Sequence, residues 1–196
     1  MKNFLNVLCD STLFKNTTAN QIHRALASIE YIVKSYEKGE LIFRVDQTTK
    51  YIGIILEGSI EIQKNLASGK AISILNKKRG DLFGEGSVFS KTITYPCNIF
   101  TTTKSTILLI SKENMLNLIA KDTTLLNNFL SSFANRVLLL NLKTELLSYS
   151  SIQQKIAFSL LYLMDEIKSI MLWFYPIQKK YGQSISMYHD HPYLGN

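Results

Sequence analysis

Short β-rich runs between residues 36 and 110 constrain the fold of this chain more than any other feature. They are rich in β-branched and aromatic residues, and they lie at 41–43, 51–56, 59–63, 71–75, 98–103 and 106–110. Six of the nine glycines separate these runs. Short strands joined by turns at regular intervals are typical of a β-sandwich or jelly roll, so we predict that fold for this region.

Helical patterns flank the β-rich region on both sides. Residues 1–34 contain short helical patterns, with Ile22, Leu26 and Ile29 spaced to share one buried helical face. On the other side, Ser111 is a candidate N-cap, and the pattern stays helical after it. The chain is therefore predicted to be α+β, with a jelly roll followed by helices.

The helix expected over residues 123–148 carries an apolar stripe with alternating spacings of four and three residues. Its members are Leu126, Leu130, Phe133, Val137, Leu140, Thr144 and Leu147. Such a/d spacing is typical of a coiled-coil seam, although a single globular core uses the same stripe. We favour a dimer seam because the pattern lasts three heptads. A further helix is expected from 150–151, with one face formed by Ile152, Ile156, Leu160, Leu163 and Ile167.

Charge and cysteine content exclude several classes of protein. The net charge is +7, but it is spread along the chain, and the densest run, at residues 77–79, is more typical of a solvated turn than of a phosphate site. Two cysteines, Cys9 and Cys97, cannot form a disulfide framework. The N-terminus lacks the apolar core of a signal peptide, and apolar stretches are far shorter than the ~20 residues of a membrane span. We expect a cytoplasmic protein without a membrane partner.

The sequence also argues against an enzyme, a metal site or a cofactor. It shows no nucleophile–base pair, no metal constellation and no glycine loop that would cradle a phosphate. Two cysteines are too few for an iron–sulfur cluster, and haem ligation would rest on His23 alone.

In order and spacing, the motifs resemble the Crp/Fnr superfamily of bacterial transcription regulators. The matching stretches are YEKGELIF at residues 36–43, IILEGSIEI at 54–62, GDLFGE at 80–85 and SIQQKIA at 151–157. The resemblance covers most of residues 10–168. It implies an eight-strand roll that binds a small-molecule effector, a helix that dimerises, and a C-terminal winged helix-turn-helix that reads DNA.

The resemblance places the ligand site at Gly84, Glu85, Gly86, Tyr95 and Pro96. Members that bind cyclic nucleotides carry Phe-Gly-Glu and then Arg-Ser/Thr-Ala, whose arginine pairs with the cyclic phosphate. This chain has the first motif but reads Tyr95-Pro96-Cys97 at the second. A buried phosphodiester without a guanidinium costs several kcal/mol, which argues against a cyclic nucleotide. Tyr95 is expected either to offer its phenol to an unidentified organic effector or simply to pack the roll.

The C-terminal sequence departs from the family where the DNA-binding domain should follow. Residues 171–196 show no recognition-helix pattern and hold the only tryptophan, two of the three prolines and two of the three histidines. The neighbouring reading frame from Trp173 onward is compatible with Leu-Pro-x-Ser-Lys-Lys and then a recognition-helix-like segment. We therefore hypothesise that a frameshift near residues 169–172 replaced the DNA-reading module; the nucleotide sequence decides this. On this interpretation His189 and His191 are not a metal pair.

These observations define the expected domains and two hypotheses for function. We expect a roll over 1–122, a dimerisation helix over 123–148, the start of a winged-helix remnant over 149–170 and an aberrant tail over 171–196. The leading hypothesis is the effector-sensing, homodimerising part of a Crp/Fnr-type regulator. DNA is the partner of intact relatives, but the tail argues against DNA binding here. The alternative is a stand-alone module that acts through protein contact and heterodimerisation.

Overall fold

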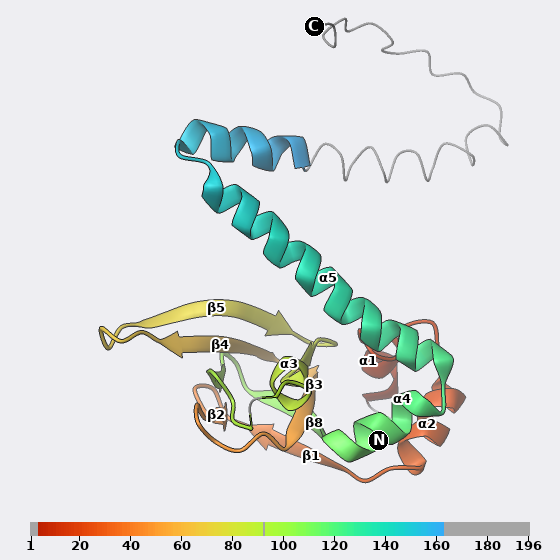
Figure 1. The fold of residues 1–196 in the computed structure, drawn as a ribbon. Helices are drawn as coiled ribbons and strands as arrows, with labels where there is room; N and C mark the ends of the chain where they lie inside the picture. The colour runs from red at the N-terminus through yellow and green to blue at the C-terminus, as the bar shows by residue number, and fades with distance from the viewer. Residues whose placement is uncertain (1–3, 92, 163–196) are drawn as a thin grey trace, which may run out of the picture. The chain divides into compact units, whose positions relative to one another are not determined.

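Two four-stranded antiparallel sheets form the roll (Figure 1). The computed structural model describes residues 4–91 and 93–162. One sheet has the strand order β1 (Tyr31–Tyr36), β8 (Ser105–Ser111), β3 (Tyr51–Glu57) and β6 (Leu82–Phe83). The other has the order β2 (Leu41–Phe43), β7 (Asn98–Thr101), β4 (Ser59–Asn65) and β5 (Ala71–Lys78). This arrangement confirms the predicted jelly roll.

Five helices with defined bounds accompany the roll. They are α1 (Leu5–Cys9), α2 (Ala19–Ala27), α3 (Glu85–Val88), α4 (Lys112–Ala120) and α5 (Thr123–Ser148). A further helix occupies residues 152–162. By its contacts the chain divides into two compact units, residues 1–136 and 137–196, and each is described here by itself. The long helix expected over 123–148 and the helix after it are thus both present.

Side chains from both sheets and from α1, α2, α4 and α5 form one apolar core. The central strand β3 is buried on both faces, and Ile52, Ile54 and Ile55 have no exposed surface. Helix α2 contributes Ile22 and Leu26, both fully buried, as their spacing predicts. This helix begins with a capping box: Thr18 Oγ1 accepts from Gln21 N at 3.3 Å, and Gln21 Oε1 accepts from Thr18 N at 2.8 Å.

Two sequence assignments need correction. Residues 31–34, placed in the helical N-terminal region, belong to strand β1, and β6 was not anticipated. β1 lies at the edge of its sheet and exposes Ile32 and Val33, so it lacks the alternation that indicates a half-buried strand. Strand β6 has two residues, too few to show any periodicity. By contrast, the predicted cap of α4 is confirmed, because Ser111 Oγ accepts from Asn114 N at 3.2 Å.

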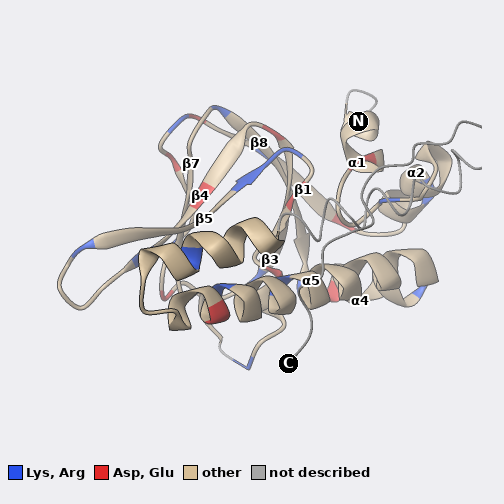
Figure 2. Ribbon diagram, turned by 90° about the horizontal axis from the view of Figure 1, so that it is seen from above, with Lys and Arg blue, Asp and Glu red and all other residues tan. Residues whose placement is uncertain are grey.

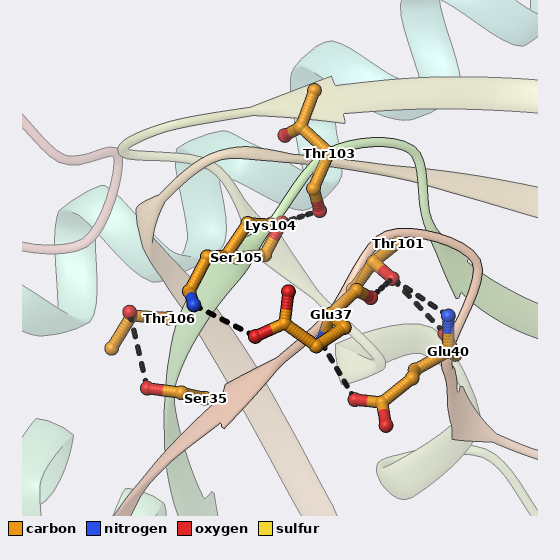
Figure 3. A network of polar contacts seen from close by, with 8 residues as sticks. All are labelled: Ser35, Glu37, Glu40, Thr101, Thr103, Lys104, Ser105 and Thr106. Carbon is orange, nitrogen blue, oxygen red and sulfur yellow. Dashed lines mark hydrogen bonds and ion pairs between the residues drawn. The ribbon is translucent and has the colours of Figure 1, made fainter.

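A polar network closes one corner of the roll, where the turn after β1 meets the turn between β7 and β8 (Figure 3). The buried hydroxyl of Thr101 donates to Glu37 O at 2.5 Å and accepts from Glu40 N at 3.0 Å. At the surface of the same corner, Lys104 Nζ lies 2.7 Å from Glu37 Oε1. Because both charged side chains are exposed, the buried hydroxyl contributes more to this corner than the ion pair does.

Helix α5 is attached to the N-terminal segment by the side-chain amide of Asn128. Its Nδ2 donates to Leu13 O at 2.9 Å and to Lys15 O at 2.6 Å. Leu125 and Phe129 of the same helix are buried in the core. The first turns of α5 are therefore part of the unit that contains the roll.

Gly53 offers a test of the packing inside the roll. A methyl group on Gly53 would overlap the ring of Phe83, its register partner on β6. We expect Gly53→Ala to lower the free energy of unfolding by about 2 kcal/mol in urea denaturation, since overpacked cores lose stability. Gly86→Ala is the matched control, because its methyl would meet only Arg136 NH1 at 3.8 Å. Equal stability of the two variants would contradict this packing.

Candidate functional site

A tight turn between β6 and α3 carries the predicted glycine–glutamate–glycine motif. Gly84 precedes α3 with a φ of 82°, a left-handed conformation that side chains with a Cβ rarely adopt. A methyl at this position would also lie 3.2 Å from Tyr51 O on β3. The turn therefore passes close to β3 and directs the next residue inward: the side chain of Glu85 is 6% exposed, whereas Gly86 is exposed.

The carboxylate of Glu85 is paired with a residue of the helix that follows the roll. Its Oε1 accepts a hydrogen bond from Arg136 NH1 on α5. Its second oxygen, Oε2, is buried and accepts no hydrogen bond from the residues that the structure describes. Burial of a carboxylate is tolerated when a cation neutralises it, but an unpaired buried acceptor remains unfavourable. The site thus has its charge compensated and one acceptor open to a donor.

Lys77 of β5 adds a second cation near this carboxylate. Its Nζ donates to Leu82 O at 2.6 Å, next to the turn. Burial lowers the pKa of the Lys77 amine; the negative charge of Glu85 counteracts this, while Arg136 adds to the lowering. Strand β5, the β6–α3 turn and helix α5 therefore converge on Glu85.

Tyr95, the other predicted ligand residue, is held by the roll itself. It is 2% exposed, and its ring stacks on Phe43 with centroids 4.4 Å apart. Its hydroxyl donates to Tyr51 O at 2.8 Å and accepts from Tyr51 N at 3.1 Å and Lys50 N at 3.3 Å. This is the geometry expected for a residue that packs the roll. Pro96 is exposed, and a ligand role for either residue stays a prediction.

The predicted seam residues fall into two groups along α5. Leu126 and Phe133 are partly buried and pack against the core of the roll. The other five are exposed: Leu130, Val137, Leu140, Thr144 and Leu147. Thr144 Oγ1 donates to Leu140 O at 2.9 Å, so the polar member of the stripe is satisfied within its own helix. Leu126 and Phe133 thus contribute to the core, and the exposed residues from Val137 onward remain accessible to a partner.

Charged residues are scattered over the described ribbon (Figure 2). No helix among the described residues is long and apolar enough to cross a membrane. In the same part of the chain, no group of three His, Cys, Asp or Glu residues is placed to hold a metal ion. His189, His191 and the proposed aberrant tail lie outside the described residues.

Comparison with known families identifies the class of this domain. Residues 33–122 match the family model described as "Cyclic nucleotide-binding domain". The matched segment includes seven of the eight strands in full and the Glu85 turn. Residues 33–122, which are 90 of the 196 residues, are therefore similar to this family of domains.

Solved structures, transcriptional regulators among them, share the fold of this domain. The catabolite activator protein of Thermus thermophilus superimposes with a TM-score of 0.63 at 21% identity, over 70% of this chain and 63% of that protein. The sensor domain of the regulator DNR from Pseudomonas aeruginosa gives 0.58 at 18% identity, over 75% and 93% of the two chains. A transcriptional regulator from Thermotoga maritima gives 0.57 at 28% identity, over 65% and 97%. No curated protein sequence matches the chain.

Two residues of the site were not anticipated from the sequence. Arg136 was not assigned a role, and Lys77 was assigned to a solvated turn. Lys77 is instead partly buried, with its ammonium bonded to Leu82 O. The available indication for Arg136 was that it is the one charged residue between positions 123 and 142 of α5. Its partner, 51 positions earlier, leaves no local pattern.

The hydroxyl of Tyr95 provides a pH-dependent test of the site. Burial raises the pKa of Tyr95 above its ordinary value of 10.0, an effect that hydrogen bonds from the backbone of Tyr51 and Lys50 partly offset. A raised folded-state pKa contributes stability that is complete below the unfolded value and is lost as pH rises through the folded value. We expect Tyr95→Phe to cost about 1–2 kcal/mol at neutral pH, because backbone groups lose their partner.

The measurement is urea unfolding of the wild type and of Tyr95→Phe at pH 7 and above pH 10. The stability difference should narrow at the higher pH, because only the wild type loses the contribution of a protonated buried hydroxyl. A constant difference across this range would contradict the proposed environment of Tyr95.

Proposed function

We propose that the chain is the effector-sensing and dimerising part of a cytoplasmic transcription regulator of the Crp/Fnr type. The observation that carries this proposal is the ion pair between Glu85 and Arg136. It joins the turn at the presumed ligand site to the helix that is expected to dimerise. A ligand that changes the surroundings of Glu85 therefore acts directly on α5.

The site favours an effector that donates a hydrogen bond. Arg136 already neutralises the charge of Glu85, so a second cation is not required there. The buried Oε2 atom of Glu85 still needs a hydrogen-bond donor. A hydroxyl or amide group of the effector provides this donor without adding a charge. The effector is accordingly a small organic molecule with such a group, held at the turn of Gly84, Glu85 and Gly86.

A cyclic nucleotide fits this site poorly. The segment Tyr95-Pro96-Cys97 offers no guanidinium, and the Tyr95 hydroxyl is already bonded to β3. Arg136 does supply a guanidinium, but its NH1 is bonded to Glu85. Pairing Arg136 with a phosphate instead would leave the Glu85 carboxylate buried without a cation, which is strongly unfavourable.

Calorimetric titration with cAMP and with cGMP tests this ligand assignment. We expect no saturable heat up to about 1 mM nucleotide, which corresponds to a binding free energy weaker than about −4 kcal/mol. Arg136→Gln is titrated in parallel to show whether any binding uses this guanidinium. Micromolar binding to the wild type would overturn the assignment, and its loss in Arg136→Gln would identify Arg136 as the phosphate ligand.

Effector binding would be coupled to dimer geometry through a two-state equilibrium. A ligand shifts such an equilibrium only as far as its affinities for the two states differ. A ligand that donates to Glu85 Oε2 binds the two states with different affinity if Arg136 is paired with Glu85 in one state of α5 and not in the other. In intact relatives, a DNA-binding module would read the resulting change in the helix.

The exposed part of the seam supports a homodimer. Leu130, Val137, Leu140 and Leu147 are each more than half exposed on α5. Apolar side chains at a/d spacing pair readily with a second copy of the same helix, because the two copies interdigitate. Burial of each such side chain contributes about 1.5–3 kcal/mol.

Sedimentation analysis of charge variants tests the seam. We expect the wild-type chain to be a dimer and the double variant Val137→Asp, Leu140→Asp to weaken dimerisation at least about 100-fold, or about 2.7 kcal/mol. Asn141→Asp, exposed on the same helix but outside the stripe, is the matched control and should remain dimeric. A wild-type chain that sediments as a monomer would contradict the proposed homodimer.

We further propose that this chain is defective in DNA binding. The support is the sequence of residues 171–196, which shows no recognition-helix pattern and whose neighbouring frame is compatible with one. These residues lie outside the described part of the chain. On this proposal residues 171–196 do not read DNA, while the part of the chain before them retains sensing and dimerisation.

A further inference from the structure

The segment of α5 from residue 137 to 147 carries two apolar stripes. The seam stripe holds Val137, Leu140 and Leu147. The other stripe, called here the second stripe, consists of Leu138, Leu139, Leu142 and Leu146. At about 100° per residue, the two stripes lie roughly 160° apart around the helix. Leu138 is 65% exposed and Leu139 is 53% exposed, whereas Leu142 and Leu146 are partly buried, so the first half of the second stripe is open to solvent.

A two-helix seam leaves this second stripe uncovered. In a two-stranded coiled coil, each helix buries one a/d stripe against its partner, and the opposite side faces water. A helix that is apolar on opposite sides is typical of one packed between two neighbours. The leucines of the second stripe therefore require an apolar surface other than the seam of the partner.

The helix over residues 152–162 presents a surface of this kind. Ser151 caps it, with its Oγ accepting from Gln154 N at 3.2 Å. Ile152, Ile156 and Leu160 recur every four residues and are each more than half exposed. Phe158 lies off this face and contacts Tyr149, with ring centroids 5.3 Å apart. The helix thus has one apolar face still uncovered.

A second copy of the chain is the occupant that the structure favours. Among the described residues of one chain, Leu138 and Leu139 of the second stripe and the 152–162 face stay exposed, while Leu142 and Leu146 are partly buried. The described part of the chain therefore leaves much of both surfaces uncovered. Between residues 137 and 162 the charged residues are Lys143, Glu145 and Lys155. Two copies of this segment would therefore repel each other little.

The area is also sufficient for a stable dimer. Their exposed fractions imply that the exposed apolar side chains between residues 137 and 161 offer on the order of 900 Å² per chain, close to the roughly 800 Å² per partner of a standard interface. The seam stripe alone supplies only about a third of this area. Both surfaces are needed to reach it.

We propose that the 152–162 helix of each copy packs on the second stripe of the partner's α5, so that the dimer interface contains four helices. This inference rests on the proposed homodimer. It adds that the segment after α5 contributes to dimerisation directly, whether or not a DNA-reading module follows it.

Disulfide trapping in the full-length chain tests the proposal. The background carries Cys9→Ser and Cys97→Ser, which removes the native thiols. A chain with Leu139→Cys is mixed with a chain carrying Ile156→Cys and then oxidised mildly. We expect a crosslinked heterodimer on a non-reducing gel, at least about tenfold above the same experiment with Asn141→Cys in place of Leu139→Cys. Val137→Cys alone should crosslink to itself across the seam.

Each alternative gives a different result. If Val137→Cys crosslinks but the mixed pair does not, the seam stands and the four-helix interface is wrong. A disulfide formed within one chain that carries both Leu139→Cys and Ile156→Cys, without the intermolecular product, would show that the chain covers its own stripe. If no pair crosslinks and the wild-type chain sediments as a monomer, the proposed homodimer itself fails.

Discussion

A carboxylate removed from water needs a cation beside it. This requirement accounts for the pairing of the buried Glu85 with Arg136 of α5. The left-handed turn at Gly84 places the carboxylate inside the roll, where burial without a partner would cost several kcal/mol. Arg136 meets the requirement from α5, a helix that begins 38 residues after the turn. The turn at Gly84 and the helix that follows the roll are consequently joined by one ion pair, so a change in the surroundings of Glu85 also affects Arg136.

Local chemistry explains which parts of the fold could be predicted from the sequence. Ser111 indicated the start of α4, and the spacing of Ile22 and Leu26 indicated a buried helical face, because caps and helical periodicity involve residues a few positions apart. Strand β1 escaped prediction because an edge strand with exposed apolar residues shows no alternation. The pairing of Glu85 with Arg136 escaped it for a different reason: such contacts arise only when the chain folds back on itself.

For Tyr95 the sequence left two roles open, ligand binding and core packing, and the packing in the structure bears on the choice between them. A tyrosine beside a presumed ligand site is chemically suited either to bind an effector or to fill the core. Its stacking on Phe43 and its bonds to the backbone of β3 depend on segments more than 40 residues away, so the sequence offered no means to choose. The seam stripe is a similar case, since only the structure shows that Leu126 and Phe133 pack on the roll and that Leu140 and Leu147 are exposed.

The side-chain amide of Asn128 restricts how α5 can move relative to the N-terminal segment. Both of its recorded bonds reach carbonyls of the N-terminal segment, at Leu13 and Lys15, and they lie two turns before Arg136 on the same helix. Rotation of α5 about its own axis would break them at a cost of about 1 kcal/mol each. Bending of the helix beyond residue 136 leaves them intact. A change at Glu85 that rotates α5 therefore has to break both bonds of Asn128, whereas one that bends the helix beyond residue 136 does not.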